Sequence, residues 1–274
     1  MVSSDAKLLT DVVALARRAG NAILEVYGQQ FEVTNKADHS PLTLADTQSH
    51  DVIVQGLRAL TPHLPVLSEE ASDIPYGERR QWQRYWLVDP LDGTKEFVSR
   101  NGEFTVNIAL IDGHDPVLGV VHVPVSDTTY TGVRDAGASR QVGRASPSPI
   151  RTAATAATPL RIVGSRSHRD AILDRYLPRL EPYQLVAVGS SIKFCLVAEG
   201  SADLYPRFGP TSEWDTAAAQ AVVEAAGGRV VQTDGQPLRY NAKSELLNPH
   251  FLVSGDAQRD WLGELSLRDQ LQPM

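Results

Sequence analysis

Two aspartates, Asp89 and Asp92, follow an apolar run in the stretch WLVDPLDGTKEF. The run predicts a buried strand, and Pro90 should turn the chain at its end, so that both carboxylates and the Leu91 carbonyl between them can face one point. These are hard oxygen donors of the kind that Mg²⁺ accepts, and without a cation the two charges repel each other. An ordinary turn with helix-capping aspartates is the alternative, and these residues alone do not decide between the two.

The next three residues, Gly93, Thr94 and Lys95, indicate the start of a helix. The first N–H groups of a helix have no partner within it, and its dipole favours an anion. A metal ion and a phosphate could therefore meet at this point. Thr94 is either an ordinary N-terminal hydroxyl or a group that orients a water molecule.

Four further acidic residues, in three places along the chain, lie near the ends of predicted elements. Glu69 and Glu70 follow a short strand, Pro65 to Leu67, and adjacent side chains on a strand point in different directions, so one of them should enter a shared site. Asp46 and Asp215 each stand at a predicted helix start, where capping would explain them without a function. Together the acidic positions indicate a site for several metal ions, roughly 4 Å apart, that hydrolyses a phosphate ester.

Composition limits the classes of function. The chain has 274 residues, 42% hydrophobic and 22% charged, which is ordinary for a globular protein. Its formal net charge of -7 argues against a nucleic-acid-coating surface, which needs clustered cations. The single cysteine, Cys195, excludes an intrachain disulfide, and no signal peptide or long apolar segment is evident, so a reducing cytoplasm is expected. The net charge disfavours tight binding to anionic lipid but allows a loose peripheral association.

The first half of the chain has the pattern of an α+β unit. Apolar periodicity predicts a helix over residues 4–28, with Ser4 as N-cap and Gly28 as its end, and a second helix over residues 45–60. Apolar segments then follow at short intervals and predict an antiparallel meander, over residues 85–88, 104–111, 117–123 and 128–133.

The second half changes to alternating short strands and helices. Strands are expected in LRIVGS, QLVAVGSS, RVVQ and FLVSG, with helices over residues 168–179, 190–199 and 215–226 between them. The small, Pro-rich residues 145–159 are the best linker, so we place the boundary between residues 1–150 and 151–274.

Three blocks now show a resemblance to a known family. DPLDGT at 89–94, SEE at 68–70 and WDTAA at 214–218 make the chain similar, over roughly residues 10–255, to the magnesium-dependent, lithium-sensitive inositol monophosphatase superfamily. Within it the chain resembles the 3'(2'),5'-bisphosphate nucleotidases of the CysQ type. The segments that carry this closer resemblance are KADHSPLTLAD, GSRSH at 164–168, GSSIKFCLVAEGSADLYPR at 189–207 and GPTSEWDTAAAQ at 209–220.

The resemblance implies a set of metal ligands. Glu69, Asp89 and the Leu91 carbonyl correspond to ligands of a first magnesium ion, and Asp89, Asp92 and Asp215 to ligands of a second. A third, weaker ion would depend on Glu69 and water.

The resemblance also implies a mechanism. Asp46 and Thr94 would orient and deprotonate a water molecule for in-line attack on the 3'-phosphorus, with the phosphate oxygens held by the N–H groups of Gly93 and Thr94.

The nucleotide end is assigned by the same resemblance. Ser165, His168, Ser190, Ser191 and Lys193 would recognise the base, the ribose and the 5'-phosphate. Without the family context, Lys193 would be a solvated surface group and His168 an ordinary residue at a helix N-terminus.

Four neighbouring residues receive no ligand role. Cys195 and Trp214 are expected to pack in the core, and the sequence leaves Glu213 and Arg207 unplaced.

The expected activity is hydrolysis of adenosine 3',5'-bisphosphate to AMP and phosphate in sulfate assimilation, with 3'-phosphoadenylyl sulfate as a further substrate. An inositol or sugar monophosphatase is the enzymatic alternative, and a metal or nucleotide sensor the non-enzymatic one. The implied fold is a layered αβαβα sandwich, and both a monomer and a homodimer are compatible with it.

Overall fold

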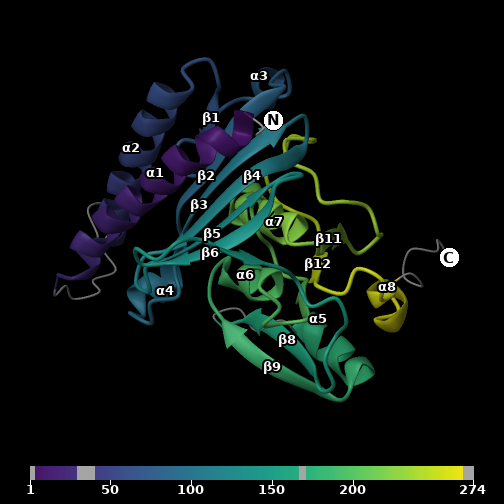
Figure 1. Cartoon of the computed structure of the whole chain (residues 1–274). Helices are drawn as coiled ribbons and strands as arrows, with labels where there is room; N and C mark the ends of the chain where they lie inside the picture. Colours follow the sequence, from purple (N-terminus) through teal and green to yellow (C-terminus); the bar gives the residue numbers. More distant parts are fainter. Residues whose placement is uncertain (1–3, 30–40, 167–170, 268–274) are drawn as a thin grey trace.

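Two sheets organise the computed structural model, which describes residues 4–29, 41–166 and 171–267 (Figure 1). The first sheet has seven strands in the order β1-β2-β3-β4-β5-β6-β7, antiparallel except for the parallel pair β1–β2. Its strands are β1 (Val66–Ser68), β2 (Arg84–Asp92), β3 (Thr105–Asp112), β4 (Asp115–Val123), β5 (Thr128–Val133), β6 (Gly137–Val142) and β7 (Ser148–Ile150). The predicted meander is confirmed, and β6 and β7 extend it.

The second sheet has five strands in the order β11-β12-β10-β8-β9. They are β8 (Leu160–Ser165), β9 (Tyr183–Val188), β10 (Leu204–Arg207), β11 (Arg229–Gln232) and β12 (Phe251–Ser254). The strands β8, β9 and β10 are parallel to one another, whereas β12 is antiparallel to both β10 and β11, so the sheet is mixed. The alternation of strands and helices was predicted; β10 was not.

The helices occupy three layers (Figure 1). They are α1 (Ser4–Tyr27), α2 (Pro41–Leu60), α3 (Tyr76–Arg79), α4 (Thr94–Val98), α5 (Ala171–Tyr176), the 3₁₀ turn η1 (Leu177–Leu180), α6 (Ile192–Ala198), α7 (Glu213–Ala225) and α8 (Trp261–Glu264). The predicted start of α2 at residue 45 was wrong by one turn. Pro41 lies in the first turn of α2, where its missing N–H removes no hydrogen bond. None of the helices in the described residues is long and apolar enough to cross a membrane.

Alternation along the strands creates the layers. In β2, Trp86 and Val88 pack with α1 and α2, whereas Tyr85 and Leu87 belong to the cluster on the opposite face, which contains α6 and α7. In the second sheet, neighbouring residues of β8, β10, β11 and β12 likewise belong to the cluster that holds α6 and α7 or to the cluster that holds α5 and α8. The result is the expected αβαβα sandwich.

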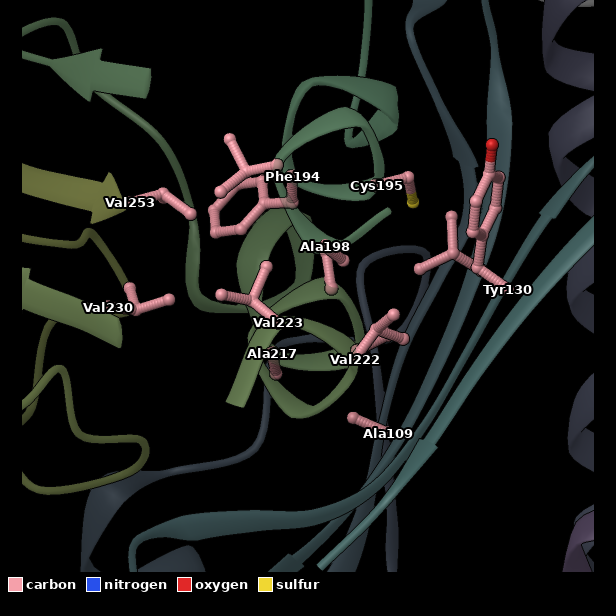
Figure 2. Close-up of a cluster of buried hydrophobic side chains, with 14 of the residues drawn as sticks. Ala109, Tyr130, Phe194, Cys195, Ala198, Ala217, Val222, Val223, Val230 and Val253 are labelled. Atoms are coloured by element: carbon pink, nitrogen blue, oxygen red, sulfur yellow. The ribbon is translucent and has the colours of Figure 1, made fainter. Parts of the chain in front are cut away.

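The middle layer joins the two sheets. Helix α7 packs so closely on the first sheet that a Cβ atom at Gly119 would lie 2.0 Å from the Ala218 carbonyl oxygen, and one at Gly132 would lie 2.5 Å from that of Ala221. Figure 2 shows the other side of this contact, where Phe194 of α6 and Val223 of α7 face Val253 of the second sheet. Helix α7 is therefore held between both sheets and cannot shift without disturbing either.

The predicted linker, residues 145–159, contains the strand β7 and then a stretch without helix or strand until β8. The change between sheets thus falls within that segment. The buried cluster in the middle layer draws residues from both sides of position 150, so the two halves share one core. The division into residues 1–150 and 151–274 stays a prediction.

Candidate active site

A pocket of about 360 Å³ lies where β2 and α4 of the first half meet α6, β10 and α7 of the second. Eleven of the predicted site residues line it: Glu69, Asp89, Leu91, Asp92, Gly93, Thr94, Ser165, Ser190, Ser191, Lys193 and Asp215. Asp46 is absent from this lining, and His168 lies outside the described residues. Predicted site residues up to 146 positions apart in the sequence therefore come together at one cavity.

A bulge in β2 places Asp89 and Asp92 on one face. Asp89 is opposite Asn107 and Asp92 is opposite Thr105, so three steps along β2 match two steps along β3. Residues two apart on a strand share a face, and the extra residue of the bulge therefore brings both carboxylates to the same side. The turn predicted at Pro90 is in fact this bulge, because β2 continues through Asp92.

Asp89 is the most buried of the pocket carboxylates, with 1% of its surface exposed. Its Oδ1 accepts the Leu91 N–H at 3.0 Å. Burial raises the pKa of Asp89 well above its ordinary value, and repulsion from Asp92, Glu69 and Asp215 raises it further. Such a group carries a charge at neutral pH most readily when a cation lies beside it.

Asp92 accepts more hydrogen bonds from the protein than Asp89 does. Its Oδ2 accepts the Ser191 N–H at 2.6 Å and lies within 3.4 Å of donors on Thr105 and Asn107. Burial still raises the pKa of Asp92, although Lys193 and these hydrogen bonds lower it. Asp92 therefore links the metal side of the pocket to the loop that precedes α6.

Asp215 lies in the first turn of α7, and its Oδ2 accepts the Ser212 N–H at 2.8 Å. Capping therefore accounts for one carboxylate oxygen, while the residue also lines the pocket. Burial raises the pKa of Asp215 to about 8, with repulsion from Asp92 as the next cause. The capping interpretation and the functional one thus describe the same side chain.

Glu69 stands at the solvent-exposed edge of the pocket, immediately after β1. Burial of its carboxyl group raises its pKa, while hydrogen bonds with the side chains of Asp89 and Trp214 lower it. Trp214 was expected only to pack. It also binds Glu69, a role that the sequence gave no signal for because the two residues lie 145 positions apart.

Asp46 lies in the second turn of α2, not at a helix start as predicted. Burial raises its pKa to about 8, followed by repulsion from Glu70 and then Glu69. Both glutamates therefore act on Asp46, although Glu69 alone lines the pocket. Asp46 thus belongs to the electrostatic surroundings of the pocket carboxylates.

Gly93 and Thr94 form the corner between β2 and α4. Gly93 has φ 100°, a conformation that favours glycine, and a Cβ atom there would lie 3.2 Å from the Glu103 carbonyl oxygen. The predicted helix start is confirmed, since α4 begins at Thr94. The chain can make this close turn from strand to helix only because residue 93 has no side chain.

Four of the residues assigned to the nucleotide also line the pocket: Ser165, Ser190, Ser191 and Lys193. Lys193 is 5% exposed, and its Nζ donates to the carbonyl oxygens of Val188 at 3.2 Å and Ser190 at 2.5 Å. The interpretation of Lys193 as a solvated surface residue was wrong. Burial lowers its pKa to about 8, while Asp92 acts in the opposite direction.

The three serines differ in their surroundings. Ser191 is 2% exposed, and its hydroxyl donates to Asn107 Oδ1 at 2.8 Å, so it supports the loop around Asp92. Ser165 and Ser190 are half-buried and line the pocket.

Arg207 is a pocket residue that the sequence left unplaced. It is 7% exposed, and its Nη2 donates to the Pro210 carbonyl oxygen at 2.8 Å. Its buried Nε has no hydrogen-bond partner among the described residues. The missed strand β10 carries Arg207, and without that strand its direction could not be predicted.

The pocket carboxylates fit a divalent cation by their chemistry. They are hard oxygen donors, and burial together with their mutual repulsion raises the pKa of Asp89 and Asp215 in the protein alone. No three Asp, Glu, His or Cys side chains of the described residues already form a metal-binding group.

The layered fold and the carboxylate-lined pocket between its halves define a phosphatase of the αβαβα type. A family model described as the inositol monophosphatase family matches residues 5–262. The chain belongs to the inositol monophosphatase family.

Known proteins are similar over nearly the whole chain. The protein 3'(2'),5'-bisphosphate nucleotidase CysQ of Escherichia coli (strain K12) is 54% identical over 250 residues, which cover 90% of this chain and 99% of that protein. The protein of the same name from Haemophilus influenzae is 38% identical, covering 95% of this chain and 97% of that protein.

Solved structures show the same fold. The crystal structure of CysQ from Bacteroides thetaiotaomicron has a TM-score of 0.84 and 41% identity, covering 94% of this chain and 100% of that one. An inositol monophosphatase from Zymomonas mobilis has a TM-score of 0.79 at 23% identity, covering 97% and 99%, and this likeness shows the fold alone.

Proposed function

We propose that the protein is a magnesium-dependent 3'(2'),5'-bisphosphate nucleotidase that hydrolyses adenosine 3',5'-bisphosphate to AMP and phosphate. The observation that carries this proposal is the pocket, which is lined both by carboxylates and by two buried cations, Lys193 and Arg207. A substrate with two phosphates fits such a cavity, because one anion can lie at a metal site while the second lies near the protein cations. The 54% identity to a relative of that name supports the substrate class.

The magnesium sites follow the donors in the pocket. Glu69, Asp89 and the Leu91 carbonyl would hold one ion, and Asp89, Asp92 and Asp215 a second, with a third, weaker ion near Glu69. Bound there, Mg²⁺ supplies positive charge for the phosphate oxygens and acidifies a water molecule.

Side chains and backbone groups of the protein carry out the hydrolysis step. Thr94 and Asp46 orient the attacking water, and Asp46 accepts its proton. The water oxygen forms the new bond to the 3'-phosphorus as the bond to the 3'-oxygen breaks, and that oxygen leaves with a proton from solvent. The N–H groups of Gly93 and Thr94 hold the phosphate oxygens.

At the ligand end, Ser165, Ser190 and Lys193 contact the nucleoside and its 5'-phosphate, and His168 takes part from the neighbouring segment. Ser191 contributes by supporting Asp92. Arg207 joins Lys193 near the 5'-phosphate.

The surroundings of the protein follow from this activity. The enzyme acts in the cytoplasm, with a loose association at the inner face of the membrane permitted, and removes a by-product of sulfate assimilation. It works as a monomer or a homodimer, and light scattering at several protein concentrations distinguishes them.

The test is phosphate release from equal concentrations of adenosine 3',5'-bisphosphate, adenosine 3'-monophosphate and inositol 1-phosphate, with Mg²⁺ and with EDTA. Preference for the bisphosphate, abolished by EDTA, is expected. Equal rates with the 3'-monophosphate would contradict recognition of a second phosphate. Preference for the inositol ester would make the protein an inositol phosphatase, and nucleotide binding without turnover would make it a sensor.

A further inference from the structure

An ion pair crosses from one half of the molecule to the other at the pocket edge. Arg166 follows β8, and Glu103 precedes β3. Their side chains meet in a bidentate contact, with Arg166 Nε 2.8 Å from Glu103 Oε2 and Arg166 Nη2 2.8 Å from Glu103 Oε1. Such paired geometry fixes direction as well as distance.

Backbone hydrogen bonds extend the contact. Glu103 Oε2 also accepts the Gly189 N–H at 2.7 Å, and Arg166 Nη2 donates to the Ala187 carbonyl oxygen at 2.7 Å. The Arg166 N–H donates to the Val188 carbonyl oxygen at 3.2 Å. The pair therefore holds the ends of β8 and β9 against the segment before β3.

The residues next to this pair line the pocket. Ser165 precedes Arg166 and Ser190 follows Gly189, and both line the cavity. The backbone of Glu103 in turn lies against the other side of the site, because a Cβ atom at Gly93 would lie 3.2 Å from the Glu103 carbonyl oxygen, and one at Gly189 would lie 2.8 Å from it. The Glu103 carbonyl oxygen thus lies close to both Gly93 and Gly189.

We propose that Glu103 and Arg166 are a positioning pair that sets the distance between Gly93 at the phosphate end and Ser165 and Ser190 at the nucleotide end. This inference rests on the proposed function. Neither residue is assigned a contact with substrate. Isolated exposed ion pairs contribute little to stability, so the pair acts chiefly on the geometry of the cavity.

A substrate that spans both ends should depend on the pair, and a small one should not. The variants Glu103→Gln and Arg166→Gln, and the double variant, are assayed with adenosine 3',5'-bisphosphate and with p-nitrophenyl phosphate, which is too small to reach both ends. Each single variant should raise KM for the nucleotide about 5- to 10-fold with kcat changed less than about twofold. The double variant should resemble the single ones, because both remove one interaction.

The molecule offers a matched control in Arg259 and Glu264. Their contact is also bidentate, at 2.8 and 2.7 Å, with both side chains about as exposed as the positioning pair, and neither residue lines the substrate pocket. Glu264→Gln should leave both KM values unchanged. Thermal unfolding of every variant reports any general loss of structure.

Several outcomes would overturn the positioning pair. They are an unchanged nucleotide KM, an equal rise in KM for both substrates together with a lower Tm, or a double variant whose effect is the product of the two single effects. If the unmodified enzyme does not hydrolyse the nucleotide but does hydrolyse p-nitrophenyl phosphate, the proposed function fails first. The two failures are therefore distinguishable in one set of assays.

Discussion

Asp89 and Asp203 are both almost completely buried, at 1% and 0% exposed, yet their pKa values are shifted in opposite directions. Asp203 accepts three hydrogen bonds from Arg161, from its backbone N–H at 2.8 Å, from Nε at 3.0 Å and from Nη2 at 2.6 Å. Burial raises the pKa of Asp203, but these contacts outweigh it and leave the pKa below its ordinary value. Asp89 is surrounded by carboxylates, and its pKa is raised.

The difference separates a structural carboxylate from a functional one. A buried charge is retained either because the protein pairs it or because a partner from outside completes it. Asp203 holds β8 to the loop before β10 and needs nothing further. Burial and repulsion disfavour the ionised form of Asp89, as expected of a carboxylate that a cation completes.

The largest expected effect is on activity, from Asp89→Asn. Removing this charge should lower kcat/KM for adenosine 3',5'-bisphosphate about 10³-fold or more, because it weakens both proposed metal sites. The same change relieves repulsion, so the Tm of the metal-free protein should rise. Kinetics and thermal unfolding in EDTA measure the two effects.

Asp112→Asn is the control for this variant, since Asp112 is exposed at the distant end of β3. It should change neither activity nor Tm. An Asp89→Asn enzyme that keeps more than about a tenth of the activity would remove Asp89 from the proposed mechanism.

Asp203→Asn should have the opposite effect to Asp89→Asn, because it should lower stability and leave activity unchanged. It removes the charge that pairs with Arg161 and should lower the free energy of unfolding by about 2–4 kcal/mol, less than for a fully buried pair because Arg161 is 34% exposed. Activity per folded molecule should stay unchanged. Urea unfolding gives the free energy, and an unchanged midpoint would show that the pair contributes nothing net.

The raised pKa values of the pocket carboxylates predict that the stability of the metal-free protein depends on pH. Asp46 and Asp215 each have a pKa of about 8 in the folded protein, above the ordinary 3.8. The folded state therefore binds their protons more tightly than the unfolded state, and this contribution is lost as pH rises towards 8. His122 has the opposite shift, to about 4 because burial disfavours its charged form, and its contribution no longer changes above its ordinary value of 6.5.

Between about pH 6.5 and 8, the Tm of the metal-free protein should fall as these carboxylates ionise. Mg²⁺ should raise Tm more at the upper end of this range, because it binds the ionised form. Asp215→Asn should reduce both the slope and the Mg²⁺ effect. A Tm difference with and without Mg²⁺ that stays constant over this range would contradict the ionisation of these groups.

The sequence predicted the parts of the site whose signals are local. The strand before Asp89, the helix start at Thr94 and the helix that carries Asp215 all follow from short apolar patterns and turn residues. The bulge in β2 could not be predicted, because it is defined by the register with Asn107 and Thr105 on another strand.

Long-range packing accounts for the other differences. Lys193 has the pattern of a surface residue in the first turn of α6, and its burial depends on how β9 and β10 close around it. Strand β10 was missed because it has four residues, one of them Pro206, which disfavours a strand. Arg207 was left unplaced for the same reason.

The smallest expected effect concerns Trp214, which supports a functional carboxylate in the way that Arg161 supports Asp203. Trp214→Phe keeps an aromatic ring for packing but removes the indole N–H that binds Glu69. The Mg²⁺ concentration for half-maximal activity should rise up to about tenfold, with the rate at saturating Mg²⁺ nearly unchanged, because the group that orients a ligand affects ion affinity more than the reaction itself.

Trp82→Phe controls for the loss of an indole, since Trp82 packs on Tyr85 with ring centroids 5.7 Å apart and does not line the pocket. Titration of activity with Mg²⁺ in both variants shows whether the hydrogen bond from Trp214 to Glu69 affects the affinity for Mg²⁺. If the two tryptophan variants respond alike, the hydrogen bond to Glu69 has no part in ion binding, and Trp214 is a packing residue. A selective effect of Trp214→Phe would show that the protein itself orients Glu69 before an ion arrives.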